Sequence, residues 1–319
     1  MKPTQIGLLI LKLVVAGILL WYVLQKVDLA VLMARFENFQ PGWGAAGIAI
    51  LFGLLLLTGV RWHIVSGVIG ASISYRLAIR MMMLGQFFNQ VLPSSVGGDG
   101  VRAWLLSREG IPIRLTLVSV VCDRVAGLIT LTIIVAITLP MVLLMGVTAI
   151  PIAWPLSIGA LTISGLFLLY RWGSTISDWL SAQPMMRPVG VIVRNLRVVL
   201  FSQQSGLRIA ALSVLAQALV VLSLCLLALS LRIELGAIHL LMFPVILLVS
   251  SIPISFAGWG LRESAMVVGL GFAGMPASEA LALSVTLGLG LLCIGLPGLA
   301  ILVSSNPWQS RSISKIYKP

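Results

Sequence analysis

Long apolar segments, separated by short polar and basic ones, make up most of the chain. A helix needs about 20 apolar residues to cross the roughly 30 Å hydrocarbon core of a bilayer. We therefore predict an all-α polytopic membrane protein, a single integral membrane domain over residues 1–319. The expected spans lie near Ile6–Leu24, Gly42–Val60, Leu115–Leu139, Ile152–Tyr170, Leu207–Leu231 and Ser278–Val303. Lys12 interrupts the first apolar run and no cleavage site follows it, which favours a retained span over a signal peptide.

Two further apolar segments, about 77–106 and 238–275, are interrupted by proline and glycine. Neither reads as a continuous helix, because proline removes a backbone donor and glycine is a weak helix former. Irregular backbone at membrane depth is tolerated where it is buried in protein or lines a wet cavity. We expect each segment to be a re-entrant hairpin of two broken helices that enters the bilayer and returns on the same side.

The two interruptions share a ten-residue pattern. Residues 93–102 read PSSVGGDGVR and residues 253–262 read PISFAGWGLR, an offset of 160 in a chain of 319 residues. The matching pairs are Pro93 and Pro253, Ser95 and Ser255, Gly98 and Gly258, Gly100 and Gly260, and Arg102 and Arg262. Chance matching of small residues is the alternative in a glycine-rich chain. The pattern predicts two repeats, 1–150 and 151–319, joined by a basic loop at about 171–207, and paired interruptions of this kind point to a transport site.

Charge placement orients this model. Hydrophobic residues form 59% of the chain, charged residues 9%, and mean hydropathy is +1.11, which excludes a soluble domain. With a cytoplasmic N-terminus, 15 basic residues lie inside and 4 outside, as cytoplasmic loops require. The inner set is Lys2, Arg61, Arg76, Arg80, Arg102, Arg108, Arg114, Arg171, Arg187, Arg194, Arg197, Arg208, Arg311, Lys315 and Lys318, and the outer set is Lys26, Arg35, Arg232 and Arg262.

This topology makes the two repeats inverted. Each half holds three full spans and one hairpin, and an odd number of spans turns the second half upside down. The first hairpin would enter from the cytoplasm and the second from outside, so that their tips meet near the midplane. Many secondary transporters have this arrangement. Both termini and the 171–207 loop would be cytoplasmic, and residues Leu29–Phe39 would form an amphipathic helix on the outer interface.

The hairpin tips carry the candidate chemistry. The run that contains Gly97, Gly98 and Gly100 is not a stable helix, so we expect the helix to restart near Val101 with Asp99 or Ser95 as its cap. A helix N-terminus favours anions, and Arg102 adds a planar fork suited to phosphate. The second tip repeats this with Ser255, Gly258, Gly260 and Arg262, while Trp259 replaces Asp99 and Glu263 follows. The alternative is that both arginines only reach to the interface.

Asp123 and Arg124 form the next candidate pair, inside an otherwise apolar span. At about 1.5 Å per residue, Asp123 lies roughly 13 Å into the helix. Adjacent helical residues do not face each other, so each needs a partner elsewhere, such as Arg102 for Asp123. An ionisable residue in a membrane span indicates function or a structural ion pair. Asn89, just before the first break, either satisfies freed backbone groups or contacts a ligand.

Several function classes are disfavoured. The three cysteines (Cys122, Cys225 and Cys293) show no paired spacing, and the two histidines are far apart, so we expect no disulfide framework, metal or cofactor. There is no nucleotide-binding loop. The basic residues flank spans, where they attract anionic lipid, so nucleic acid is not expected as a partner.

These motifs together resemble the lysylphosphatidylglycerol synthase transmembrane-region family over essentially the whole chain. The residues that carry the resemblance are FFNQVLP (87–93), GGDGVR (97–102), DR (123–124), and Pro253 followed by GWGLRE (258–263). The resemblance implies an inverted-repeat fold with a lipid-accessible cavity, as in the flippase part of the multiple peptide resistance factor. It also implies an acid–Arg pair in which Asp123 is a conservative variant. In the bifunctional synthases a soluble aminoacyl-transfer domain would follow the membrane region, whereas this sequence ends at Pro319. We therefore do not expect the synthase activity.

The expected function is a flippase or scramblase of the bacterial inner membrane, moving phospholipid or a lipid-linked headgroup between leaflets. Its partners would be anionic or aminoacylated phospholipid, or isoprenoid or hopanoid lipid, with a lipid-synthesis enzyme and a homodimer as further options. One alternative is a non-catalytic accessory subunit of a lipid or glycan synthase. Another is a membrane-embedded transferase, for which the candidate acids are Asp99, Asp123 and Glu263.

Overall fold

The computed structural model describes residues 29–92, 97–147, 153–252 and 259–305. Every regular element in these ranges is helical, which confirms the all-α prediction. The helices are α2 (Leu29–Glu37), α3 (Pro41–Ile69), α4 (Tyr75–Val91), α5 (Gly97–Arg108), α6 (Ile113–Leu144), α7 (Ala153–Ala182), α8 (Arg187–Phe201), α9 (Gln203–Ser230), α10 (Ala237–Ser250), α11 (Leu261–Phe272) and α12 (Ala277–Ser305).

Five helices are long and apolar enough to cross a membrane, and each overlaps a predicted span. They are Pro41–Ile69, Ile113–Leu144, Leu156–Ala182, Gln203–Ser230 and Ala277–Ser304. The remaining predicted span, Ile6–Leu24, lies outside the described residues. A multi-pass helical membrane protein is therefore the architecture.

Helix α3 extends nine residues beyond its predicted end at Val60. It begins with Pro41 in its first turn, where a proline lacks only a donor that the helix does not use, and it ends at Gly70 in the left-handed conformation (φ 84°). The extension places Arg61 and Trp62 inside the helix, and both side chains are buried. Arg61, predicted as part of a cytoplasmic loop, is therefore an interior residue.

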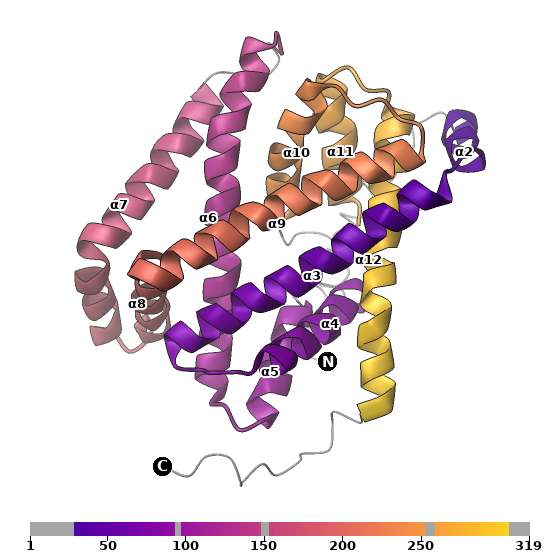
Figure 1. Ribbon diagram of the computed structural model, residues 1–319. Coiled ribbons are helices and arrows are strands. Elements are labelled where there is room, and N and C mark those ends of the chain that lie inside the picture. Colours follow the sequence, from indigo (N-terminus) through magenta and orange to yellow (C-terminus); the bar gives the residue numbers. More distant parts are fainter. Residues whose placement is uncertain (1–28, 93–96, 148–152, 253–258, 306–319) are drawn as a thin grey trace, which may run out of the picture.

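The most extensive contact between two helices is that of α3 and α9, which run side by side across the molecule (Figure 1). They approach closely at Gly47, which packs against Leu227, and the Ser223 hydroxyl donates to the Gly47 carbonyl at 3.1 Å. Small residues permit such close approach between membrane helices. This contact joins the two halves of the sequence.

The interrupted segments also contact the opposite half. Helix α4 of the first half packs on α12 of the second, and α10 of the second half packs on α6 of the first. On α12, Gly298 fits against the Met83 carbonyl, where a side chain would collide, and Gly295 lies against the backbone of Phe87. The two repeats, their inverted orientation and the re-entrant path stay predictions.

The described helices end and resume on either side of the two predicted breaks. Helix α4 ends at Val91 and α10 ends at Ser250, and the chain resumes helical structure at Gly97 and Leu261. The residues of the breaks themselves (Pro93, Ser95, Pro253, Ser255 and Gly258) lie outside the described residues.

Helix α5 begins earlier than expected. It starts four residues before Val101, and Asp99 lies in its first turn instead of at its cap. Gly98 packs directly on α4, against the Gly85 carbonyl and the Asn89 amide, at a separation that admits no side chain. Packing against α4 therefore outweighs the low helix propensity of the glycines.

The segment 171–207, expected as a loop, is mostly helical. Helix α7 continues to Ala182, and α8 occupies Arg187–Phe201. Helix α8 is amphipathic, with Gly190 and Val199 buried and Arg187 and Arg194 exposed. The Ser177 hydroxyl donates to the Gly190 carbonyl at 3.0 Å and ties α8 to α7. The polar residues of this segment are spaced for one helix face, and the expectation of a loop was wrong.

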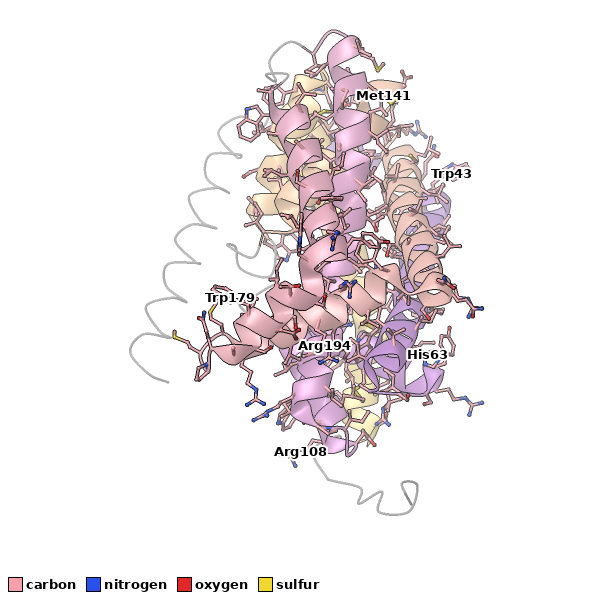
Figure 2. The ribbon with its side chains drawn as sticks, turned by 90° about the vertical axis from the view of Figure 1, so that its left-hand side faces the viewer. Trp43, His63, Arg108, Met141, Trp179 and Arg194 are labelled. Atoms are coloured by element: carbon pink, nitrogen blue, oxygen red, sulfur yellow. The ribbon has the colours of Figure 1, made fainter. Side chains whose placement is uncertain are left out.

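The links between helices gather at two opposite ends (Figure 1). The α3–α4, α5–α6 and α7–α8 links share one end, and the α2–α3, α9–α10 and α11–α12 links share the other with the C-terminal end of α6. In Figure 2, Arg108 and Arg194 lie in the lower part of the molecule, while Trp43 and Met141 lie in the upper part. The expected helix at Leu29–Phe39 is present as α2, and Arg35 pairs with Glu279 of α12 and donates to the Arg232 carbonyl.

Candidate functional site

Five charged residues from three helices meet in a first cluster, which we call the α5–α6 cluster. Its members are Arg61 of α3, Asp99 and Arg102 of α5, and Asp123 and Arg124 of α6. Arginine and aspartate alternate through it, so every carboxylate touches two guanidinium groups. Four of these residues were predicted from the sequence, and the tertiary structure adds Arg61.

The contacts run as a chain through the cluster. Arg61 Nε donates to Asp123 Oδ1 at 2.8 Å, and Arg102 Nη2 lies 3.6 Å from Asp123 Oδ2. Arg102 Nε lies 3.1 Å from Asp99 Oδ1, and Arg124 Nε donates to Asp99 Oδ2 at 2.6 Å. Asp123 therefore has the predicted partner Arg102, but Arg61 is the closer one. Asp123 and Arg124, although adjacent in sequence, have different principal partners, as helix geometry predicts.

Arg102 is the most enclosed cation of the cluster, with 2% of its surface exposed. Its guanidinium lies over the ring of Trp62, 4.6 Å from the centroid. The Trp62 indole donates to the Ser119 hydroxyl at 3.3 Å, which fixes the ring. A cation–π contact stabilises a desolvated guanidinium, so Arg102 is held in the interior and does not reach to an interface.

Arg61 is the residue that sequence reasoning missed. Besides Asp123 it donates to the Ser213 hydroxyl of α9 at 3.2 Å, and its guanidinium lies against Gly127. Arg61 thus contacts both halves of the chain. The available signal was the apolar pattern that continues past it to Ile69, which indicates an arginine within a helix.

Asn89 has a defined structural contact. Its Oδ1 accepts the Gly98 N–H at 2.8 Å, which satisfies a free backbone donor in the first turn of α5. This geometry matches the structural alternative raised for Asn89. Gly97 and Gly100 lie in the same turn, and Gly100 has open space where a side chain would be.

A second cluster lies at the start of α11. Arg262 Nη2 donates to Glu263 Oε1 at 2.7 Å, and Ser284 of α12 donates to the same oxygen at 3.3 Å. The other oxygen, Oε2, accepts the Gly260 N–H, so Glu263 also caps the helix. Arg262 lies over the ring of Trp259, 4.7 Å from the centroid, and Gly288 leaves room for both side chains.

The clusters share one arrangement, an arginine with a carboxylate partner and a tryptophan ring beneath it. Their charges differ, since the first holds three arginines and two aspartates and the second one arginine and one glutamate. Among the described residues, no ion pair or hydrogen bond joins the two clusters. The meeting of the two tips stays a prediction.

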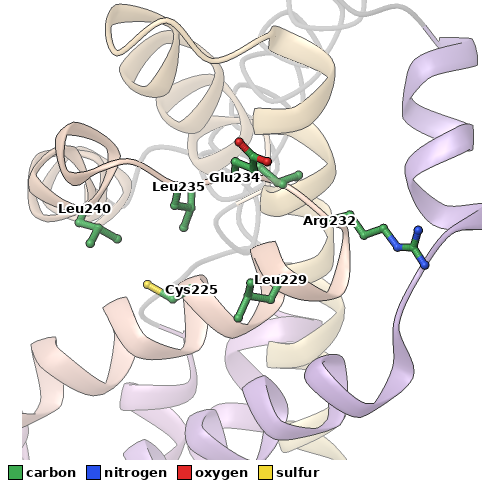
Figure 3. A pocket seen from close by; sticks show the side chains of 7 residues that line it. Cys225, Leu229, Arg232, Glu234, Leu235 and Leu240 are labelled. Carbon is green, nitrogen blue, oxygen red and sulfur yellow. The ribbon is translucent and has the colours of Figure 1, made fainter.

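An open pocket of about 610 Å³ lies elsewhere, where α9 ends and α10 begins (Figure 3). Apolar side chains line it, with Arg232 and Glu234 alongside, and none of the predicted site residues belongs to it. The described ranges contain no group of three or more His, Cys, Asp or Glu residues that could hold a metal ion. The charged clusters are therefore the candidate site.

Comparison with known proteins gives a family match over most of the chain. The family model described as "Lysylphosphatidylglycerol synthase TM region" matches residues 9–297. A relative from Methanothermobacter thermautotrophicus, described as a UPF0104 membrane protein, is 26% identical over 95 residues. That alignment covers 30% of this chain and 27% of the relative, so the chain spans about a quarter of that protein's length. No solved structure matches the chain.

Proposed function

The chain belongs to the lysylphosphatidylglycerol synthase TM region family, and from this premise we propose that it is a lipid translocase. In this proposal it moves a phospholipid or lipid-linked headgroup between the leaflets of a bacterial inner membrane, with both termini cytoplasmic. The headgroup passes the charged clusters while the acyl chains stay in the bilayer.

The observation that carries the proposal is the α5–α6 cluster, in which four of the five charged side chains are buried. Burying charge in a membrane protein is expensive, and such residues mark substrate pathways more often than they add stability. Three guanidinium groups next to the start of α5 provide planar donors and a helix N-terminus, both of which suit phosphate. The cluster is also next to the predicted break between α4 and α5, and transporters bind substrate at breaks of this kind.

A second supporting observation is the exchange of broken helices between the halves. Because α4 packs on α12 and α10 packs on α6, a rocking of one half against the other would change both of these contacts at once. Alternating access then needs no further moving part. Arg61 bonds to both α6 and α9, so its hydrogen bonds would change when the two halves move relative to each other.

An accessory role is the second candidate function. Helix α8 presents Arg187 and Arg194 on an exposed face, with Met185 next to it 91% exposed. A partner enzyme that makes a lipid or glycan could bind this basic, partly apolar surface. The transferase alternative is weaker, because Asp99, Asp123 and Glu263 are all engaged by arginine.

The test is leaflet-resolved movement of a fluorescent phospholipid in proteoliposomes that contain only this protein in known orientation. We expect Arg102→Ala to slow capture mainly from the cytoplasmic leaflet and Arg262→Ala mainly from the outer one. Arg→Lys should restore each only in part, because lysine keeps the charge but not the fork. Arg114→Ala, at the exposed start of α6, is the matched control. Wild-type rates in both folded variants would overturn the shared site and favour the accessory role.

A further inference from the structure

We infer that the α5–α6 cluster is an exchange site for one monoanionic phosphodiester headgroup, which displaces the Asp99 carboxylate from Arg124. The inference rests on the proposed function and adds the substrate class and the residue that receives it. In the exchange, Arg124 moves from Asp99 to the phosphate, while the Arg61–Asp123 pair stays closed. No covalent bond forms or breaks.

Accessibility selects Arg124 as the receiving residue. Its side chain is 50% exposed, while the side chains of Arg61, Arg102, Asp99 and Asp123 are at most 9% exposed. A headgroup that approaches the cluster from outside the packed helices therefore meets Arg124 first. The other two arginines are already enclosed by carboxylates and by Trp62.

Charge balance selects the headgroup class. Three arginines and two aspartates leave one positive charge in excess, and an anion that binds at Arg124 would balance it. One phosphodiester supplies one negative charge and neutralises the cluster. A zwitterionic headgroup would leave the excess in place, and a dianion would reverse it. The second cluster, with Arg262 and Glu263 paired, has no such excess.

Contact geometry selects Asp99 as the displaced carboxylate. Both oxygens of Asp123 face arginines that are buried, and Arg61 is also fixed by Ser213. Asp99 Oδ2, in contrast, is held by the half-exposed Arg124. Arg102 Nε lies 3.1 Å from Asp99 Oδ1 without hydrogen-bond geometry, so it is a buried donor still to be satisfied. When Arg124 leaves, Asp99 is free to close onto Arg102.

The experiment measures binding of short-chain phosphatidylglycerol and phosphatidylethanolamine to the full chain in nanodiscs of phosphatidylcholine. We expect a preference for phosphatidylglycerol that falls at least tenfold in Arg124→Gln and rises about tenfold in Asp99→Asn, in line with one charge-assisted hydrogen bond. The preference of Arg124→Lys for phosphatidylglycerol should lie between those of the wild type and Arg124→Gln. Arg114→Gln on the same helix and Asp178→Asn, both exposed, are charge-matched controls and should change nothing.

Several outcomes would overturn the inference. They are the absence of any preference for phosphatidylglycerol in the wild type, and affinities in Arg124→Gln and Asp99→Asn within twofold of wild type. Glycerophosphoglycerol, the same headgroup without acyl chains, separates the two sources of this chemistry. If it binds as tightly as the lipid, the site is one for soluble phosphodiesters and the lipid assignment is wrong.

The same variants distinguish this inference from the proposed function. If binding follows the expected order but no lipid moves in proteoliposomes, the exchange site stands and the translocase proposal fails. If lipid moves at the wild-type rate in Arg124→Gln, the exchange site fails and the translocase proposal stands. Arg124 is half-exposed, so we expect its variants to fold normally. They keep the test valid if Asp99→Asn does not fold.

Discussion

At the scale of single residues, the molecule places its charges where a membrane protein can hold them. Arg61, Arg102 and Arg262 are buried, and each lies within contact distance of a carboxylate. Two of them also lie over a tryptophan ring. A buried guanidinium needs such partners, because the free-energy cost of removing it from water is larger than the stabilisation that a surface ion pair provides.

The residue-scale prediction concerns Asp123→Asn. The change removes the charge that pairs with Arg61 and Arg102, both of them buried. Breaking a buried pair by removing one partner costs about 3–5 kcal/mol, so we expect a loss of unfolding free energy of that order and impaired transport. Denaturant unfolding in mixed micelles measures the loss.

Asp178→Asn is the control for this prediction. It makes the same chemical change and removes one charge, but Asp178 is exposed. It should alter the unfolding free energy by less than about 0.5 kcal/mol. Equal stability and activity of the two variants would show that Asp123 is neither a site residue nor a structural partner.

At the scale of elements, the broken helices depend on close backbone contact. Helix α5 begins with glycines because α4 leaves no room for a side chain at Gly98. The Asn89 side-chain oxygen then accepts a hydrogen bond from the Gly98 N–H, which has no partner within the helix. The same logic recurs where Gly298 of α12 meets α4 and where Gly288 makes room for Arg262.

The element-scale prediction compares two neighbouring glycines. Gly98→Ala places a methyl group against the Gly85 carbonyl and the Asn89 amide, which should separate α5 from α4 and cost roughly 1–3 kcal/mol. Gly100→Ala, in the same turn with nothing near, should be neutral or stabilise by roughly 0.5–1 kcal/mol, as alanine suits a helix better. Thermal unfolding of both variants in the same detergent gives the comparison. A Gly98→Ala protein as stable as Gly100→Ala would contradict the tight α4–α5 contact.

At the scale of the whole molecule, the two ends differ in charge. Arg108 and Arg194 lie toward the end that holds the α3–α4 and α5–α6 links, whereas Glu234 and Glu279 belong to links or helix starts at the other end, together with Arg35 and Arg232. This separation follows the rule that cytoplasmic loops are rich in Lys and Arg. The structure groups the predicted inner and outer segments, and the membrane orientation is still to be measured.

The whole-molecule prediction is that the α7–α8 link is cytoplasmic and the end of α6 is external. In a background without native cysteines, Met185→Cys should react with a membrane-impermeant maleimide only after the inner face is exposed. Leu144→Cys should react in intact cells. Met185 and Leu144 are 91% and 88% exposed, so access does not limit either reaction. The reverse pattern would overturn the assigned orientation, and labelling of both from one side would exclude this topology.

The sequence by itself determined the elements that depend on local composition. Hydropathy over about 20 residues locates the five described spans, since each must cover the bilayer with its own apolar side chains. Proline and glycine predicted an interruption between α4 and α5 and another between α10 and α11, because they act on the backbone at their own positions. Asp99, Arg102, Asp123 and Arg124 stood out because charge in an apolar segment is visible without knowledge of its neighbours.

Only the tertiary structure decided which charges meet. Arg61 joins Asp123 across 62 residues of sequence and Ser213 across 152, and no local pattern records such a distance. The start of α5 and the helical form of 187–201 also depend on packing, against α4 and α7 respectively. A side chain's depth in the membrane can be estimated from its own segment. Its partner depends on how helices from both halves pack, and that choice turns separate charges into one cluster with a single positive charge in excess.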